Sequence, residues 1–197
     1  MEGMGFVGTL GCFVRDSHGL YILSNSHVLA NEGLAQPGHR IGQPWPSELV
    51  AVLSRFVPFS ATIPNLVDAA LAKTDPAMPA ITGWTSAING AIHGPRAVTP
   101  DDLGREVFKV GRTTQIRRGR ITAVEVDGLP VAYDLGVLRF NDQVEISGGP
   151  ETDFSAPGDS GSLIVDGSGD ALGLLFAGGR DSVGEDFTFA NRADVVF

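Results

Sequence analysis

Short runs of apolar and β-branched residues recur along the chain and are separated by Gly, Pro, Asn and Asp. Several of these runs alternate apolar and polar positions, as strands with one buried face do. Short strands with turn residues between them are typical of all-β sandwiches and barrels, so the pattern predicts an all-β protein. The expected strands cover residues 6–14, 20–23, 50–58, 67–73, 106–110, 118–126, 131–140, 143–147, 162–165, 171–177 and 186–191.

Three segments interrupt this series of strands. Ser26 to Ala30 is the one clearly helical stretch, and residues 31–48, with three prolines and three glycines, predict a long loop. His93 to Gly104 contains two prolines, a pair of aspartates and few apolar residues, which suits a connector between two units. The sequence therefore predicts an N-terminal β domain over residues 1–95 and a C-terminal one over 96–197.

Composition and charge narrow the class of protein. Of 197 residues 43% are hydrophobic, and 14 Lys and Arg against 23 Asp and Glu give a net charge of −9, which is unfavourable for general nucleic-acid binding. No run of about 18 apolar residues predicts a membrane span, and the N-terminus lacks the basic start of a signal peptide. We therefore expect a cytoplasmic protein, with a processed fragment as the open alternative. The single cysteine, Cys12, allows no intramolecular disulfide and no Cys-rich zinc site, and we expect no metal or cofactor.

The sharpest local motif is the small-residue turn Ser155 to Ser162 (SAPGDSGS), which lies directly before an apolar run. A nucleophilic serine needs such a turn, because glycines let the backbone approach a substrate carbonyl. The amides of Gly158 and Ser160 could then form an oxyanion hole. An ordinary Gly/Asp/Ser turn is the alternative. The Gly-x-Ser-x-Gly elbow of α/β-hydrolases does not apply, because position 162 is Ser and the strand–helix alternation is missing.

A nucleophilic serine needs a base, and the chain has four histidines. His18, His39 and His93 fall in a turn, a loop and the connector, where surface positions are expected. His27 follows the apolar run Leu20 to Leu23 directly, so a strand end could hold its imidazole at the rim of a cleft. The alternative is a partly buried histidine bonded to a neighbouring carbonyl.

The base in turn needs a buried acid that fixes its tautomer and stabilises the imidazolium. Asp68 stands among apolar residues, where an unpaired carboxylate would be costly, so a partner is expected for it. The alternative is the N-cap of a short helix. The candidates His27, Asp68 and Ser160 follow the chain order of chymotrypsin-type triads, which differs from that of subtilisins and α/β-hydrolases.

On these residues the chain resembles the trypsin/chymotrypsin-like serine peptidases. More narrowly, Gln36 to Gly38 and Gly173 to Gly178 resemble a bacterial subgroup akin to the plant narrow-leaf-type serine proteases. The stretches that carry the broad resemblance are 8–14 (GTLGCFV), 24–28 (SNSHV), 67–71 (VDAAL), 107–114 (VFKVGRTT) with 119–121 (GRI), and 157–162 (PGDSGS).

The resemblance implies two six-stranded antiparallel β-barrels with the active site in the cleft between them. It also implies a serine endopeptidase that acts through an acyl-enzyme on protein or peptide substrates. Phe154 takes the position of the pocket floor, where trypsin-like enzymes carry an acid, so specificity for Lys or Arg is not expected. Phe176, Ala177 and Gly178 would form the strand on which an extended peptide adds its backbone hydrogen bonds.

Two features depart from the family pattern. Its secreted members have disulfides and begin with an apolar residue whose terminus pairs with the acid before the nucleophile. Here Cys12 is alone and is expected to be an inert core residue, and Met1-Glu2-Gly3 does not resemble such a terminus. Asp159 therefore needs another partner, and an activating partner or a homo-oligomer is one way to supply it. A catalytically silent or partner-activated peptide-binding module on the same fold stays open as an alternative, as does a ligand-binding barrel.

Overall fold

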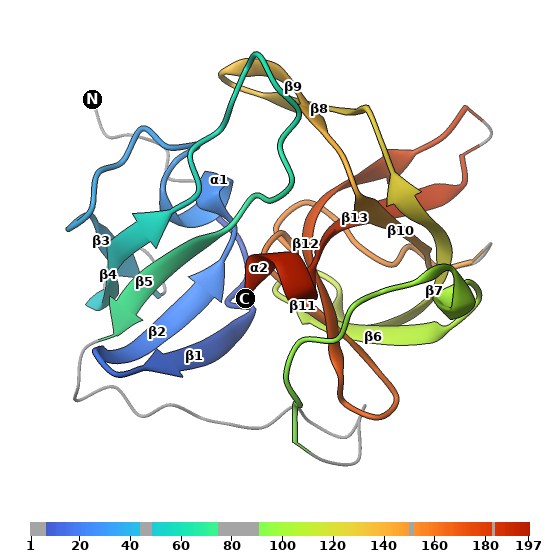
Figure 1. The fold of residues 1–197 in the computed structure, drawn as a ribbon, viewed down its shortest axis with the longest axis horizontal. Helices are drawn as coiled ribbons and strands as arrows, with labels where there is room; N and C mark the ends of the chain where they lie inside the picture. Colours follow the sequence, from blue (N-terminus) through green and yellow to red (C-terminus); the bar gives the residue numbers. More distant parts are fainter. Residues whose placement is uncertain (1–6, 44–48, 75–90, 150–151, 183) are drawn as a thin grey trace.

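The computed structural model describes residues 7–43, 49–74, 91–149, 152–182 and 184–197. Antiparallel strands form two units that lie side by side (Figure 1). The described strands of the first unit form a sheet in the order β1-β2-β5-β4-β3, and Ile22, Leu53 and Ala72 lie in its core. The elements of this unit are β1 (Cys12–Asp16), β2 (Gly19–Ser24), α1 (Ser26–Leu29), β3 (Arg40–Gly42), β4 (Leu49–Phe56) and β5 (Ala70–Thr74).

The second unit is a closed barrel of six strands in the order β10-β13-β12-β11-β6-β7. Its core contains Val107, Ile121, Ile146 and Leu172, which the alternating pattern places on the inner faces of their strands. The elements are η1 (Pro100–Asp102), β6 (Glu106–Gly111), β7 (Gln115–Val126), β8 (Leu129–Tyr133), β9 (Gly136–Phe140), β10 (Gln143–Ser147), β11 (Leu163–Asp166), β12 (Ala171–Arg180), β13 (Asp186–Arg192) and α2 (Ala193–Val196).

Most expected elements are confirmed, and two expectations are wrong. The run 131–140, expected as one strand, forms a hairpin of β8 and β9, a two-stranded sheet with one further bridge from Phe140 to Asn65. Its turn is made by Asp134 and Leu135, and Gly136 takes a φ of +114°, which favours glycine. The loop expected over 31–48 contains the short strand β3, and residues 44–48 lie outside the described residues.

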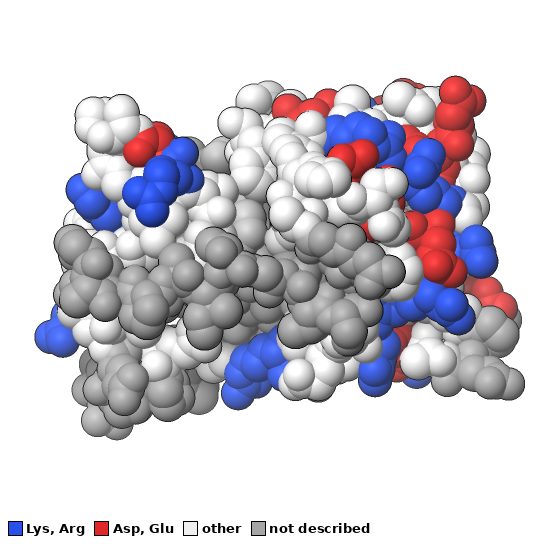
Figure 2. Space-filling view, turned by 90° about the horizontal axis from the view of Figure 1, so that it is seen from below, with Lys and Arg blue, Asp and Glu red and all other residues white. Residues whose placement is uncertain are grey.

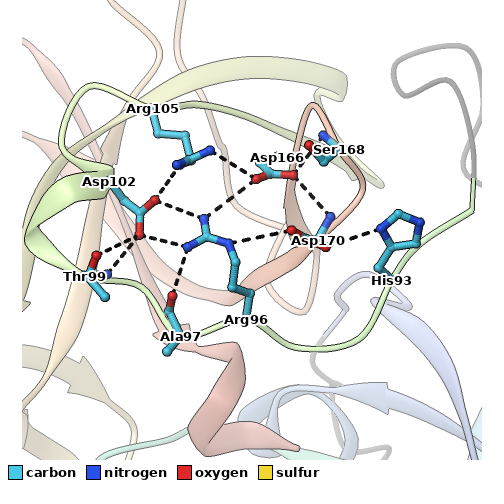
Figure 3. A network of polar contacts seen from close by, with 9 residues as sticks. All are labelled: His93, Arg96, Ala97, Thr99, Asp102, Arg105, Asp166, Ser168 and Asp170. Carbon is cyan, nitrogen blue, oxygen red and sulfur yellow. Dashed lines mark hydrogen bonds and ion pairs between the residues drawn. The ribbon is translucent and has the colours of Figure 1, made fainter.

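The connector between the units is fixed by charged side chains (Figure 3). Arg96 donates two hydrogen bonds of 3.0 Å to the two carboxylate oxygens of Asp102, and Arg105 Nε lies 2.5 Å from Asp102 Oδ1. Both arginines also reach Asp166, which ends β11. Asp102 is buried, which the polar composition of this segment did not indicate. The network ties the start of the second unit to its barrel.

Charged side chains are distributed unevenly over the surface. In the view from below, both signs lie side by side over the second unit, and fewer charges appear over the first (Figure 2). Within the described ranges, no helix is both long and apolar enough to span a membrane.

Candidate active site

His27 and Asp68 meet at the edge of the first unit. His27 is the second residue of α1, which begins two residues after the end of β2, and the rigid strand therefore fixes where the imidazole lies. Its Nδ1 lies 2.5 Å from Asp68 Oδ2, and its backbone N–H donates to Asp68 Oδ1 over 3.0 Å. The pairing leaves Nε2 as the ring nitrogen that can accept a proton.

Asp68 is fully buried two residues before β5, so the alternative of a helix cap is wrong. Its carbonyl accepts a 2.7 Å hydrogen bond from the Asn25 side chain of the first unit. Its N–H donates over 2.9 Å to the side-chain oxygen of Asn191, which lies on β13 of the second unit. The two units therefore both determine where this carboxylate stands.

Ser160 lies in the loop between β10 and β11 and comes close to the segment that carries His27. Its carbonyl accepts a 2.8 Å hydrogen bond from the N–H of Thr9 in the first unit. A Cβ on Gly8 would lie 2.8 Å from the Ser160 carbonyl oxygen and 2.5 Å from a methyl of Val28, the residue after His27. Ser160 and α1 thus border the same narrow space, which only a glycine at position 8 leaves free.

Hydrogen bonds to two carbonyl groups fix the orientation of the peptide planes in the Ser160 loop. Thr113 Oγ1 donates to the carbonyl of Pro157 over 2.8 Å, and Ser162 donates from its N–H (3.0 Å) and its hydroxyl (2.6 Å) to the carbonyl of Asp159. In a trans peptide the N–H points opposite to the carbonyl. The N–H groups of Gly158 and Ser160 therefore point away from these partners, and no hydrogen bond within the described part of the chain uses either one.

The partner of Asp159 is Lys109, a residue that the sequence analysis missed. Lys109 Nζ lies 2.6 Å from Asp159 Oδ2, and both side chains are fully buried. Asp159 also accepts hydrogen bonds from the backbone N–H groups of Thr113 (2.8 Å) and Thr114 (3.1 Å) and from the Thr114 hydroxyl (2.6 Å). The β6 sequence EVFKVG held a signal for this, because period-two alternation places Lys109 on the same inner face as Val107.

Burial and pairing act in opposite directions on these two charges. Burial lowers the pKa of Lys109, although the hydrogen bond and charge of Asp159 oppose that shift. Burial would raise the pKa of Asp159, but hydrogen bonds from Lys109 and Thr114 outweigh it and leave the pKa below its usual value. The hydrogen-bond donors around Asp159 therefore favour its carboxylate form, which faces the Lys109 ammonium.

The residues expected to bind substrate lie on two segments of the second unit. Phe154 is fully buried in the core of the barrel, and its N–H donates over 2.8 Å to Asp186 Oδ2. That Phe154 forms the floor of a substrate pocket stays a prediction. On β12 the Phe176 side chain is buried, Ala177 is half-buried and Gly178 is exposed. β11 pairs with β12 as far as Leu174, and the backbone of Leu175 still exchanges hydrogen bonds with Gly161 and Ser162. Within the described residues, no further backbone hydrogen bond uses this edge of β12 from Phe176 onward.

The remaining candidates behave as ordinary structural residues. His18, His39 and His93 are exposed, as expected. Cys12 is partly buried between two apolar clusters, and burial raises the pKa of its thiol to about 12, so it stays protonated and unreactive at neutral pH. The described residues contain no cluster of His, Cys, Asp or Glu that could hold a metal ion.

The two units and the junction between them define the fold of the chymotrypsin-like serine proteases. No family model matches the sequence, and no curated protein matches it, so the comparison depends on solved structures.

Three bacterial-type proteases illustrate the likeness. Thermobifida fusca protease A is 18% identical with a TM-score of 0.62, over 97% of this chain and 87% of that one. Nocardiopsis protease is 18% identical with a TM-score of 0.64, over 97% and 93%. A glutamic-acid-specific serine protease that uses a histidine triad in substrate binding is 21% identical with a TM-score of 0.64, over 93% and 85%. At these identities the likeness establishes the fold.

Proposed function

We propose that this protein is a serine endopeptidase whose catalytic residues are Ser160, His27 and Asp68. The observation that carries the proposal is the 2.5 Å contact between His27 Nδ1 and the buried Asp68 carboxylate, in a segment that borders the Ser160 loop. A carboxylate so placed keeps the proton on Nδ1 and leaves Nε2 as the base. The fold shared with serine proteases supports the same assignment.

The reaction follows from these roles. Ser160 Oγ attacks the scissile carbonyl carbon while His27 Nε2 takes its proton, and the imidazolium is stabilised by the Asp68 carboxylate. The substrate oxygen gains negative charge and accepts hydrogen bonds from the N–H groups of Gly158 and Ser160. His27 then protonates the leaving amine, and water, activated by the same base, hydrolyses the acyl-enzyme.

The substrate is proposed to be an extended peptide. Its backbone would pair with Phe176, Ala177 and Gly178 along the edge of β12 that β11 leaves unpaired in the described structure. Phe154, in place of an acid, argues against a demand for Lys or Arg at the cleaved bond. Uncharged residues are therefore the expected specificity.

The alternative of a silent or partner-activated peptide-binding module is less well supported. That alternative was motivated by the lack of an evident partner for Asp159, and Lys109 of the same chain occupies that place at 2.6 Å. The loop can therefore hold its shape within one chain, and we propose that the monomeric chain is sufficient for activity.

Digestion of a peptide library, followed by mass spectrometry, tests the function. Wild-type protein should cleave peptides, and Ser160→Ala should lose at least about 10⁴-fold in rate, the scale of losing a catalytic serine. Ser17→Ala removes an exposed hydroxyl from the β1–β2 turn and should cleave as the wild type does. Peptide binding by folded wild type without any cleavage would instead support the binding module.

A further inference from the structure

A residue outside the triad reaches the carboxylate that orients the base. Tyr133 ends β8, and its hydroxyl donates a 3.0 Å hydrogen bond to Asp68 Oδ2. The same oxygen lies 2.5 Å from His27 Nδ1, so the tyrosine and the histidine share one acceptor atom. Burial, followed by the Asp68 charge and hydrogen bond, raises the pKa of Tyr133, so its hydroxyl keeps the proton that it donates.

Aromatic packing fixes the ring that carries this hydroxyl. The Tyr133 ring centroid lies 4.9 Å from that of Phe59 and 6.1 Å from that of Phe140. It also meets the His27 ring edge-on, with centroids 6.0 Å apart and planes at 62°. The tyrosine therefore contacts both members of the pair, one by a hydrogen bond and one by its ring.

The hairpin that carries Tyr133 is attached to the segment that carries His27. The two carboxylate oxygens of Glu32 accept hydrogen bonds of 3.1 Å each from the N–H groups of Asp134 and Leu135, the turn of the β8–β9 hairpin. Glu32 is buried and lies five residues after His27, beyond α1. Glu32 thus holds the turn of the hairpin, while Asn65 of the first unit bridges to Phe140 at its other end.

We propose that Tyr133 is a positioning residue for the catalytic pair: its hydroxyl holds Asp68 Oδ2 in line with His27 Nδ1, and Glu32 keeps the β8–β9 hairpin in place to do so. The inference rests on the proposed peptidase function and adds a residue from the second unit to the mechanism. It also explains why a hairpin outside the barrel packs over the junction.

The charged and titratable groups around the pair are few. The imidazole of His27 and the hydroxyl of Tyr133 face the Asp68 carboxylate, and Glu32 acts on the tyrosine from further away. Asn25 and Asn191 contact only the Asp68 backbone and carry no charge. Removing the hydroxyl should leave His27 Nδ1 as the one side-chain partner of Asp68 Oδ2 within the described residues, so the carboxylate loses one of the two contacts that orient it.

The test uses the rate at which a fluorophosphonate labels Ser160, measured across pH, so that no substrate need be known. Tyr133→Phe keeps the ring and removes the hydroxyl. We expect its plateau rate to fall about tenfold, equivalent to about 1.4 kcal/mol, within the range for a hydrogen bond to a charged group. Tyr21→Phe, at the only other tyrosine, on β2, should match the wild type.

The outcomes separate this inference from the proposed function. If the wild type is labelled and Tyr133→Phe matches Tyr21→Phe in plateau rate, the positioning role is wrong and the peptidase stands. If the folded wild type is not labelled, the proposed function is wrong. A separate measurement tests the contact between the Tyr133 hydroxyl and Asp68. The NMR resonance of the His27 Nδ1–H proton should shift in Tyr133→Phe and stay unchanged in Tyr21→Phe. An unshifted resonance in Tyr133→Phe would overturn the inference.

Discussion

Lys109 and Asp159 place two opposite charges in the barrel interior, directly before the proposed nucleophile. Each side chain is fully buried, and the ion pair is 2.6 Å long. Removing charges from water is costly, and a buried pair is often no more stabilising than apolar residues of the same volume. Its use here is positional, because the Asp159 carboxylate also holds the N–H groups of Thr113, Thr114 and Ala156.

Replacing Lys109 should therefore be far more damaging than its distance from the reaction suggests. Lys109→Met leaves the Asp159 carboxylate buried without its cation, and we expect a loss of about 3–5 kcal/mol in the free energy of unfolding. Fluorophosphonate labelling should fall with it, because the loop that carries Asp159 and Ser160 loses its support. Urea unfolding at pH 7 measures the first effect.

The chain supplies a matched control for this substitution. Its only other lysine, Lys73 on β5, is exposed, so Lys73→Met should change the stability little. Equal losses in the two variants would show that the buried ion pair has no special structural role.

At the scale of elements, a network of charged side chains holds the connector against the second barrel. Arg96 binds Asp102 through two hydrogen bonds of 3.0 Å, and Arg105 reaches Asp102 and Asp166 from the other side (Figure 3). The hydrogen bond from Arg96 is the main cause that holds the pKa of Asp102 well below its ordinary value. The connector should therefore be a site of acid sensitivity.

The sign of this dependence follows from the lowered pKa. The stability that Asp102 contributes is fully present above the ordinary carboxylate pKa of about 3.9 and is lost as pH falls below it. Arg96→Gln should cost about 1–2 kcal/mol at pH 7 and flatten the fall in stability below about pH 4. Urea unfolding from pH 7 to pH 2.5 measures both.

Arg118→Gln is the matched control for the connector. Arg118 is exposed and lies 3.6 Å from Glu106, so its loss should leave the stability and its acid dependence close to the wild type. An acid limb in Arg96→Gln as steep as that of Arg118→Gln would contradict the role given to the network.

The sequence predicted the features that depend on neighbouring residues, and it missed contacts between residues far apart in the chain. Alternation and turn residues predicted most strands, and the order of His27, Asp68 and Ser160 predicted the candidate site. The β8–β9 hairpin was missed because the run 131–140 looks like one continuous strand. In the structure the chain turns at Asp134 and Leu135, between β8 and β9. Two partners were missed: Tyr133 lies 65 positions from Asp68, and Lys109 lies 50 positions from Asp159. No local pattern joins residues so far apart in the chain.

At the scale of the whole molecule, the residues of the proposed site come together where the two units meet. The first unit supplies His27 and Asp68, and the second supplies Ser160. Contacts between the units fix their relative position at several points: Thr9 with Ser160, Asp68 with Asn191, and Glu32 with the β8–β9 turn. Neither unit alone holds the complete set of proposed catalytic residues.

The most direct test of this account is labelling of the purified chain with a fluorophosphonate, followed by peptide mapping. We predict one label per chain, on Ser160, lost in Ser160→Ala and slowed at least about 10³-fold in His27→Ala, because both the nucleophile and its base are then needed. Absence of labelling in the folded wild type, a label on another residue, or an unchanged rate in His27→Ala would contradict it.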